Sequence, residues 1–237
     1  MSRKTLEEAK DDNVLLARID GPRNLAESVY IRIEEAITNL TLKPGDEIQE
    51  VKLAKQLGTS VTPVREALSR LAGDGLIVRE PNKRPRVAKF SYKEIENLYD
   101  IRGALESLGI YLAASHITSD DIASLRQLQE QGSIYVLSRK IEEYKAYNAH
   151  FHQSILNISH NVLLAEMMET IRKKIVLFVS STVLIPGRSE QGIKEHAEMI
   201  NLLEKRDASA AREAMRNHIE LAKEVFLSNY QKNVSED

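Results

Sequence analysis

The sequence predicts a mainly helical protein, with a small unit of three helices and a hairpin followed by a larger antiparallel helical bundle. Apolar residues form 42% and charged residues 29% of the 237 residues, a composition with which a chain can bury a core. Aromatic residues form only 5%, while Leu, Ile, Ala and Glu recur, which favours helices over β-sandwiches. In most segments apolar residues lie three to four positions apart, the spacing of an amphipathic helix.

Residues 1–22 are rich in charge, and we expect them to form a tail. The smaller unit is expected over 23–90, with its first helix over 24–40. The apolar residues of this helix fall on one face: Leu25, Val29, Ile33, Ile37 and Leu40. The sequence Lys-Pro-Gly-Asp at 43–46 is typical of a turn and ends the helix.

Two short helices follow, with Gly58 between them. The first is predicted over about 50–57, because Gly is favoured just after a helix C-terminus. For the second we expect Thr62 as the N-cap and Pro63 in the first helical position. Near the end of the unit, two short apolar stretches flank a polar turn and predict a hairpin.

Residues 91–232 are predicted to be entirely helical. Six helices are expected, at 92–116, 119–137, 139–156, 161–184, 190–205 and 207–231. The clearest break between them is Ile-Pro-Gly at 185–187. Short connections between consecutive helices predict an antiparallel bundle.

Composition also excludes several classes of protein. The sequence has no Cys, which excludes disulfides, Cys-ligated metal sites and thiol nucleophiles. The most apolar stretch is the eleven residues 175–185, well short of the roughly 20 that a membrane span needs. The first residues have no apolar core, so we expect no signal peptide. We therefore expect a soluble, cytoplasmic protein with no membrane partner.

A basic cluster lies within the smaller unit, although the net charge of the chain is −2. Residues 61–90 contain seven Lys and Arg against three Asp and Glu. This cluster is either a solvated basic face or a surface for an anionic partner, and charge alone favours neither.

The helices on either side of Gly58 favour the anionic partner, because their order and tight turn are typical of a helix-turn-helix. In that motif the second helix enters the major groove, and its first turn meets the base edges. The candidate DNA-binding residues are Ser60, Thr62, Arg65, Arg70, Lys83 and Arg84.

These residues have different expected roles. The hydroxyls of Ser60 and Thr62 can hold phosphates, and the guanidinium of Arg65 can bind guanine or phosphate in two-pronged fashion. Arg70 lies one to two turns further on and is either a contact to the DNA backbone or a solvated surface residue. Lys83 and Arg84 lie in the hairpin turn, and we expect them to contact a flanking groove.

Residues 53–68, LAKQLGTSVTPVREAL, followed by Leu71 and Asp-Gly-Leu at 74–76, resemble the winged helix-turn-helix of GntR-family transcription regulators. The resemblance implies a sequence-specific regulator, acting as a repressor, that binds a near-palindromic operator as a homodimer. The sequence departs from the family in two places. Val61 stands where Arg is usual, and the turn at 82–85 lacks the usual Gly.

The histidines of the larger unit form a second candidate site. His152 lies four residues after Asn148, so the two share one helix face. His196 and His218 each lie eleven residues from a predicted turn at Asp207, which puts both about 16 Å from the turn on antiparallel helices. Three imidazoles could therefore converge inside the bundle, or serve as three separate structural residues.

Phe-His at 151–152, Glu-His at 195–196 and His218 resemble the FCD effector-binding domain of the FadR branch of the family. This resemblance implies a divalent transition metal, Zn or Ni, held by Asn148, His152, His196 and His218. Asn148 stands where the family commonly has Asp, so all four ligands are neutral. The charge of the metal is then uncompensated, which predicts a small carboxylate effector.

Arg102 is the candidate effector-binding residue. It lies within an otherwise apolar helical stripe: Leu98, Leu105, Gly109 and Leu112. A buried guanidinium needs a partner, either Glu106 four residues on or a bound anion. The stretch 99–106 resembles the first helix of the effector domain, which implies that Arg102 faces the effector cavity.

Two other functions are compatible with these residues. One is a metal-independent regulator that responds to an acyl ligand. The other is a helical metal-dependent hydrolase in which His152, His196 and His218 activate water and Glu195 acts as the base. The sequence has no His-Glu-x-x-His motif, and a hydrolase leaves the helix-turn-helix unexplained, so we expect a protein that is not an enzyme.

Overall fold

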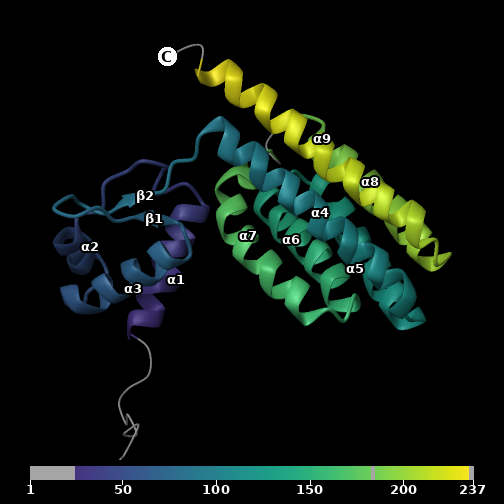
Figure 1. Ribbon diagram of the computed structural model, residues 1–237, viewed down its shortest axis with the longest axis horizontal. Helices are drawn as coiled ribbons and strands as arrows, with labels where there is room; N and C mark the ends of the chain where they lie inside the picture. Colours follow the sequence, from purple (N-terminus) through teal and green to yellow (C-terminus); the bar gives the residue numbers. More distant parts are fainter. Residues whose placement is uncertain (1–24, 183–184, 235–237) are drawn as a thin grey trace, which may run out of the picture.

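A computed structural model describes residues 25–182 and 185–234; the predicted tail at 1–22 lies outside the described residues. The smaller unit of three helices and a hairpin stands beside a bundle of longer helices (Figure 1). The predicted fold class is therefore confirmed. None of the described helices is long and apolar enough to cross a membrane.

The smaller unit consists of α1 (Leu25–Thr38), α2 (Glu50–Gln56), α3 (Val61–Gly73), β1 (Ile77–Val78) and β2 (Arg86–Val87). The strands form the predicted hairpin, antiparallel, with Ile77 opposite Val87. The apolar stripe of α1 packs on α3, and the core they share contains Ile33, Ile37, Val64, Leu68 and Leu71. Because α3 buries one side against α1, its opposite side is exposed and can face a partner.

The start of α3 differs from the prediction. Ser60, not Thr62, is the N-cap, with an extended backbone at φ −80° and ψ 168°, so Pro63 occupies the third helical position. Proline is tolerated there because the first backbone N–H groups of a helix have no intrahelical acceptor. Gly58 has φ +65°, the left-handed conformation that allows the tight turn after α2.

The bundle consists of α4 (Tyr92–His116), α5 (Ser119–Leu137), α6 (Ile141–Ile158), α7 (Val162–Thr182), α8 (Arg188–Glu204) and α9 (Ala208–Val234). The first two helices have the predicted bounds, and the others differ by one to three residues where their ends are described. Side chains at 91 and 94 form a capping box for α4, and those at 118 and 121 form one for α5. The end predicted for 161–184 falls partly on residues that are not described.

Within the bundle, α4 makes its most extensive contacts with α9, while α5 packs against α6 and α8. The largest fully buried side chains of this unit include Tyr99, Phe151, Ile155 and Met199. They come from α4, α6 and α8, so the faces of these helices meet at one core.

Gly132 of α5 tests how tightly this core is packed. A Cβ atom at this position would lie 2.6 Å from the ring of Tyr147 on α6. We expect Gly132→Ala to lower the free energy of unfolding by about 1–3 kcal/mol, because a buried aromatic ring must move. Denaturant unfolding of the purified chain measures this change.

Gly103→Ala is the matched control, since Gly103 also lies inside a helix of the bundle. Its added Cβ would lie 3.6 Å from Ile219, an ordinary contact distance. We expect this substitution to be neutral, or to stabilise by up to about 1 kcal/mol through the higher helix propensity of alanine. Equal losses of stability at both positions would contradict tight packing at Gly132.

One helix of the bundle, α7, also contacts the smaller unit. Nζ of Lys173 lies 2.9 Å from Oδ1 of Asp74, which follows α3 directly. The hydroxyl of Tyr30 on α1 donates to Oδ2 of the same carboxylate at 2.7 Å. Burial raises the pKa of Asp74, but the hydrogen bonds from Tyr30 and Lys173 outweigh burial and hold the pKa below its usual value. The carboxylate therefore joins α1, α3 and α7.

Candidate functional site

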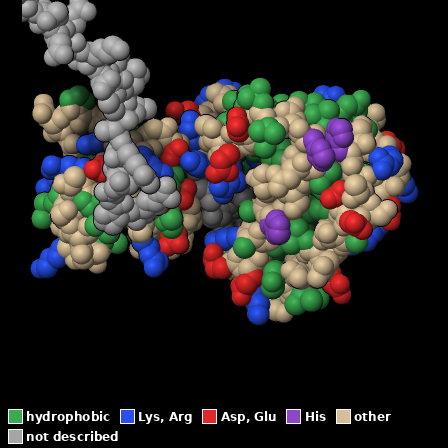
Figure 2. Space-filling view, turned by 90° about the horizontal axis from the view of Figure 1, so that it is seen from below, with side chains coloured by type: hydrophobic (Ala, Val, Ile, Leu, Met, Phe, Trp, Pro, Cys, Tyr) green, Lys and Arg blue, Asp and Glu red, His purple; other side chains and the backbone are tan. Residues whose placement is uncertain are grey.

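The predicted DNA-binding residues all lie on the surface of the smaller unit. Ser60 is exposed at the N-cap of α3, Thr62 in its first turn and Arg65 at the start of its second turn, and Arg70 is exposed further along the helix. The other two residues, at 83 and 84, are exposed in the turn between β1 and β2. Figure 2 shows Lys and Arg side chains standing out from this unit, with acidic side chains beside them.

Each of the four basic candidates is paired with a glutamate. Nε of Arg65 lies 2.6 Å from Oε2 of Glu50, at the start of α2. The other pairs are Arg70 with Glu27, Lys83 with Glu80, and Arg84 with Glu47. Ion pairs between exposed side chains contribute about 0–1 kcal/mol, so phosphate groups can displace them. Sequence reasoning missed these acidic partners, most of which are distant in sequence.

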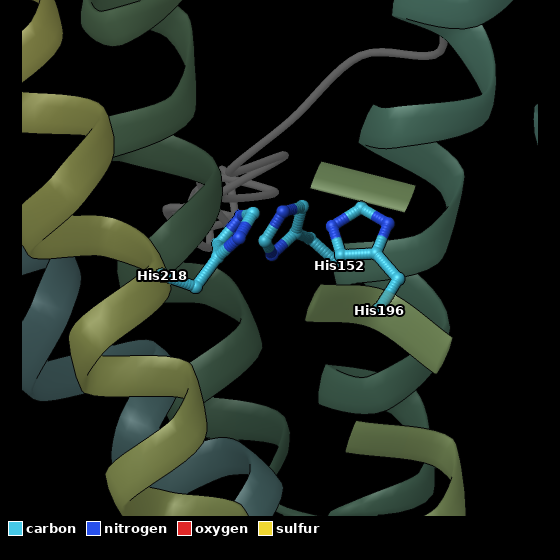
Figure 3. A group of neighbouring side chains, drawn as sticks. All are labelled: His152, His196 and His218. Carbon is cyan, nitrogen blue, oxygen red and sulfur yellow. The ribbon is translucent and has the colours of Figure 1, made fainter. Parts of the chain in front are cut away.

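Three histidines converge inside the bundle, as their spacing allows. His152 comes from α6, His196 from α8 and His218 from α9, and all three side chains are buried. One ring nitrogen from each lies within 4.8 Å of the others. Figure 3 shows the three rings facing one another.

Two atoms of this cluster lack any hydrogen-bond partner among the described residues: Nε2 of His152 and Nε2 of His196. An unpaired polar atom in a protein interior is unfavourable, which points to a ligand that the described chain does not supply. Burial lowers the pKa of His196 and His218 well below the usual value, so both rings are neutral and keep a lone pair for a metal. The residues present therefore fit a divalent transition metal, for which imidazole is a suitable ligand.

The Nδ1 atoms of the three rings all have neighbours outside the cluster. Nδ1 of His152 contacts Oε2 of Glu106 on α4. Nδ1 of His218 lies 2.5 Å from Oε2 of Glu195, and Nδ1 of His196 lies 2.8 Å from the hydroxyl of Tyr147. Metal-binding histidines in proteins almost always have such outer partners.

A small cavity, partly open to solvent, adjoins the cluster at His218. Its walls include the side chains of Tyr99, Arg102, Asn148, Thr182, Arg188 and His218. Asn148 thus lies beside the same cavity as His218, which is compatible with the predicted fourth ligand. The exposed His150, on another side of α6, does not reach it.

Arg102 lines this cavity and is 7% exposed. Its Nε donates to Oε1 of Glu106 at 2.6 Å, so the internal partner that the sequence offers is used. The hydrogen bonds of the described residues use no other atom of the Arg102 guanidinium. The two Nη groups therefore remain available for an anion in the cavity.

Arg188 is a cavity residue that sequence reasoning missed. Its Nη1 lies 3.0 Å from Oε2 of Glu195, and its Nη2 lies 3.3 Å from the backbone oxygen of His218. No signal in the sequence pointed to it, because the helix was predicted to begin at 190, which left Arg188 in the preceding connection. Glu195 accepts from both Arg188 and His218, so it is not a free base for hydrolysis.

A helix-turn-helix with a hairpin wing, joined to a helical domain with a buried histidine cluster, defines a ligand-responsive class of transcription regulator. Residues 25–87 match the bacterial regulatory proteins of the gntR family, and residues 97–221 match the FCD domain. The chain therefore belongs to the GntR family and carries an FCD domain in its C-terminal part. This confirms the resemblance found in the sequence.

Relatives agree with this assignment. The chain is 27% identical over 209 residues to the HTH-type transcriptional repressor RspR of Escherichia coli (strain K12), covering 87% of this chain and 91% of RspR. It is 27% identical over 202 residues to the HTH-type transcriptional regulator YdhC of Bacillus subtilis (strain 168), covering 85% of this chain and 90% of YdhC. The solved structure of E. coli McbR/YncC has a similar fold, with a TM-score of 0.76 and 24% identity, over 87% of this chain and 99% of that chain.

The family and these relatives identify the chain as a DNA-binding transcriptional regulator. Members of the family regulate transcription and are not enzymes, which confirms the expectation from the sequence. The alternative of a helical hydrolase is thereby excluded.

Proposed function

We propose that this regulator is a repressor whose affinity for its operator changes when a small carboxylate binds at a metal in the helical domain. Residues 23–90 bind DNA, and residues 91–232 bind the metal and effector and form the dimer. The observation that carries the proposal is the buried histidine cluster, in which Nε2 of His152 and Nε2 of His196 have no partner among the described residues and His218 lines the same cavity as Arg102.

The residues that would hold the metal are Asn148, His152, His196 and His218, and imidazole nitrogens favour Zn or Ni. When bound, the metal supplies positive charge and open coordination positions for an anionic ligand.

The charges around the cavity support an anionic ligand. The buried guanidiniums of Arg102 and Arg188 are each paired with one glutamate, Glu106 and Glu195. Two positive charges and two negative charges therefore cancel, and an amide and neutral imidazoles add none. The charge of a divalent metal stays uncompensated, and a carboxylate reaching the metal and the Nη groups of Arg102 would balance part of it.

The operator is expected to be near-palindromic and bound by a homodimer. One recognition helix reads only a few base pairs, and a two-fold dimer doubles the sequence that is read. Repression is favoured because RspR, a relative over most of the chain, is named a repressor.

Helix α7 offers a connection between the two sites. Oγ1 of Thr182, near its C-terminal end, lies 3.3 Å from the hydroxyl of Tyr99, and both residues line the cavity. Lys173 of the same helix pairs with Asp74, directly after the recognition helix. A ligand that moves Thr182 would act on a helix tied to the DNA-binding unit, and the two binding events would then share a reciprocal coupling energy.

The test uses an operator selected from a random library of DNA duplexes with the full-length protein. Its affinity is measured by fluorescence anisotropy with Zn-loaded and with metal-free protein, each in the presence of acetate, lactate or citrate. We expect at least one carboxylate to change operator affinity about 5–150-fold with Zn-loaded protein, the usual range of allosteric coupling, and none to do so with metal-free protein.

Equal carboxylate affinity of the metal-free and Zn-loaded proteins, measured by calorimetry, would contradict the metal-dependent mechanism. The metal-independent regulator of an acyl ligand would then be the better description. Selection of no sequence above the random background would contradict operator binding itself.

A further inference from the structure

Two triads of side chains flank the histidine cluster, and in each the order is arginine, glutamate, histidine. The first consists of Arg102, Glu106 and His152. The second consists of Arg188, Glu195 and His218. In both triads the glutamate lies between the guanidinium and the Nδ1 atom of the imidazole, so the two arrangements are alike although they come from different helices.

In the first triad, the carboxylate of Glu106 determines which nitrogen of His152 carries hydrogen. Oε1 of Glu106 accepts from Nε of Arg102 at 2.6 Å, a buried ion pair in which the glutamate is a carboxylate. An ionised carboxylate can only accept hydrogen bonds. Nδ1 of His152 must therefore be the donor, and in the neutral ring the lone pair is then on Nε2, the atom without a partner.

In the second triad, Nδ1 of His218 has two neighbours, one that needs a donor and one that needs an acceptor. Oε2 of Glu195, at 2.5 Å, requires a donor, whereas Nη2 of Arg188, at 3.3 Å, requires an acceptor. The shorter contact, to Glu195, determines the tautomer. Nη2 of Arg188 does not need Nδ1 as an acceptor, because it can donate to the backbone oxygen of His218 at 3.3 Å. Nδ1 of His218 therefore also carries the hydrogen.

The third histidine provides an internal contrast. Nδ1 of His196 faces the hydroxyl of Tyr147, which can either donate or accept. No carboxylate contacts this ring among the described residues, so its tautomer is free to follow the ligand.

We propose that Glu106 and Glu195 are positioning residues that hold His152 and His218 as Nδ1–H tautomers before metal binds, which leaves the lone pair of each ring on Nε2. The two arginines hold the glutamates in place. The inference concerns the same site as the proposed function and rests on it for its purpose, but the tautomers themselves belong to the metal-free protein.

The direct test is long-range ¹⁵N–¹H NMR of the metal-free full-length protein labelled at histidine, recorded at a pH well above the usual histidine pKa of about 6.5. We expect His152 and His218 to show hydrogen on Nδ1 only, with the exposed His150 as the reference for a ring in solvent. An Nε2–H tautomer or an imidazolium at either position would overturn the inference.

Glu106→Gln tests the positioning role. Arg102 can only donate, so the glutamine oxygen is expected to turn toward Arg102 and its NH₂ group toward His152. Nδ1 of His152 must then accept, and the ring is expected to switch to the Nε2–H tautomer while His218 keeps hydrogen on Nδ1. Affinity for Zn²⁺, measured by competition with a chelator, is expected to fall about 10–100-fold.

Glu198→Gln, on the exposed side of α8, is the matched control and is expected to leave both tautomers and Zn²⁺ affinity unchanged. An unchanged tautomer and unchanged Zn²⁺ affinity in Glu106→Gln would overturn the positioning role. If Glu106→Gln does not fold, the NMR result on the native protein still decides. If the native tautomers are as expected but Zn²⁺ does not bind, the proposed metal site fails and the inference about the tautomers stands.

Discussion

Arg65→Ala is expected to weaken operator binding by about 1–3 kcal/mol, or roughly 5–150-fold in Kd. Arg65 is the fifth residue of the recognition helix and the basic candidate nearest its N-terminus, the end that meets base edges in a helix-turn-helix. Its side chain is 64% exposed, so removal leaves the core intact and acts on DNA binding. Fluorescence anisotropy with the selected operator measures the loss.

The pairing of Arg65 with Glu50 adds a second expectation. Without Arg65, the charge of Glu50 faces the DNA unpaired and repels the phosphates. Glu50→Ala in the Arg65→Ala background is therefore expected to recover part of the lost affinity.

Arg126→Ala is the control, because Arg126 is an exposed arginine on α5 that is also paired with a glutamate, Glu204. It should leave operator affinity unchanged, and Arg65→Ala should leave effector affinity unchanged. Equal losses of operator affinity for Arg65→Ala and Arg126→Ala would contradict the assignment of Arg65 to the DNA interface.

His196→Ala is expected to reduce metal affinity more than about 100-fold, since removing a ligand costs more than the 10–100-fold loss seen for an outer partner. His196 is fully buried, and its ring stacks on Phe151 with centroids 3.9 Å apart. Metal content after purification, measured by mass spectrometry, and titration with Zn²⁺ report the loss. The hydroxyl of Tyr147 also loses its partner, which is expected to lower stability by about 1–3 kcal/mol.

Operator binding by effector-free His196→Ala should be unchanged, because the DNA-binding residues lie in the other unit. His150→Ala is the matched control: His150 lies on the same helix as His152 but is exposed, and its removal should leave metal content unchanged. Loss of operator binding with retained metal would reverse the roles given to the two units.

The bounds of the helices were predictable because they depend on short-range patterns. The apolar period predicted the bounds of α4 and α5 to the residue. At α3 the same reasoning gave the wrong start, because Pro63 is compatible with any position in the first turn and therefore does not fix where the helix begins.

The candidate metal site was predictable only in part. The spacing of Asn148, His152, His196 and His218 along helices brought these residues into consideration, since periodicity determines which side chains share a face. The spacing could not decide between convergence and three separate buried histidines, because that choice depends on how the helices cross.

The sequence by itself determined the helical class, the recognition helix and the histidines, because each follows from local spacing or from a motif contiguous in the chain. Only the tertiary structure decided the carboxylate partners of two of the histidines: Glu106 for His152 and Glu195 for His218. Each of these pairs joins two different helices, so it depends on how the helices pack. Residues 46 positions apart, such as Glu106 and His152, meet only when the bundle is assembled.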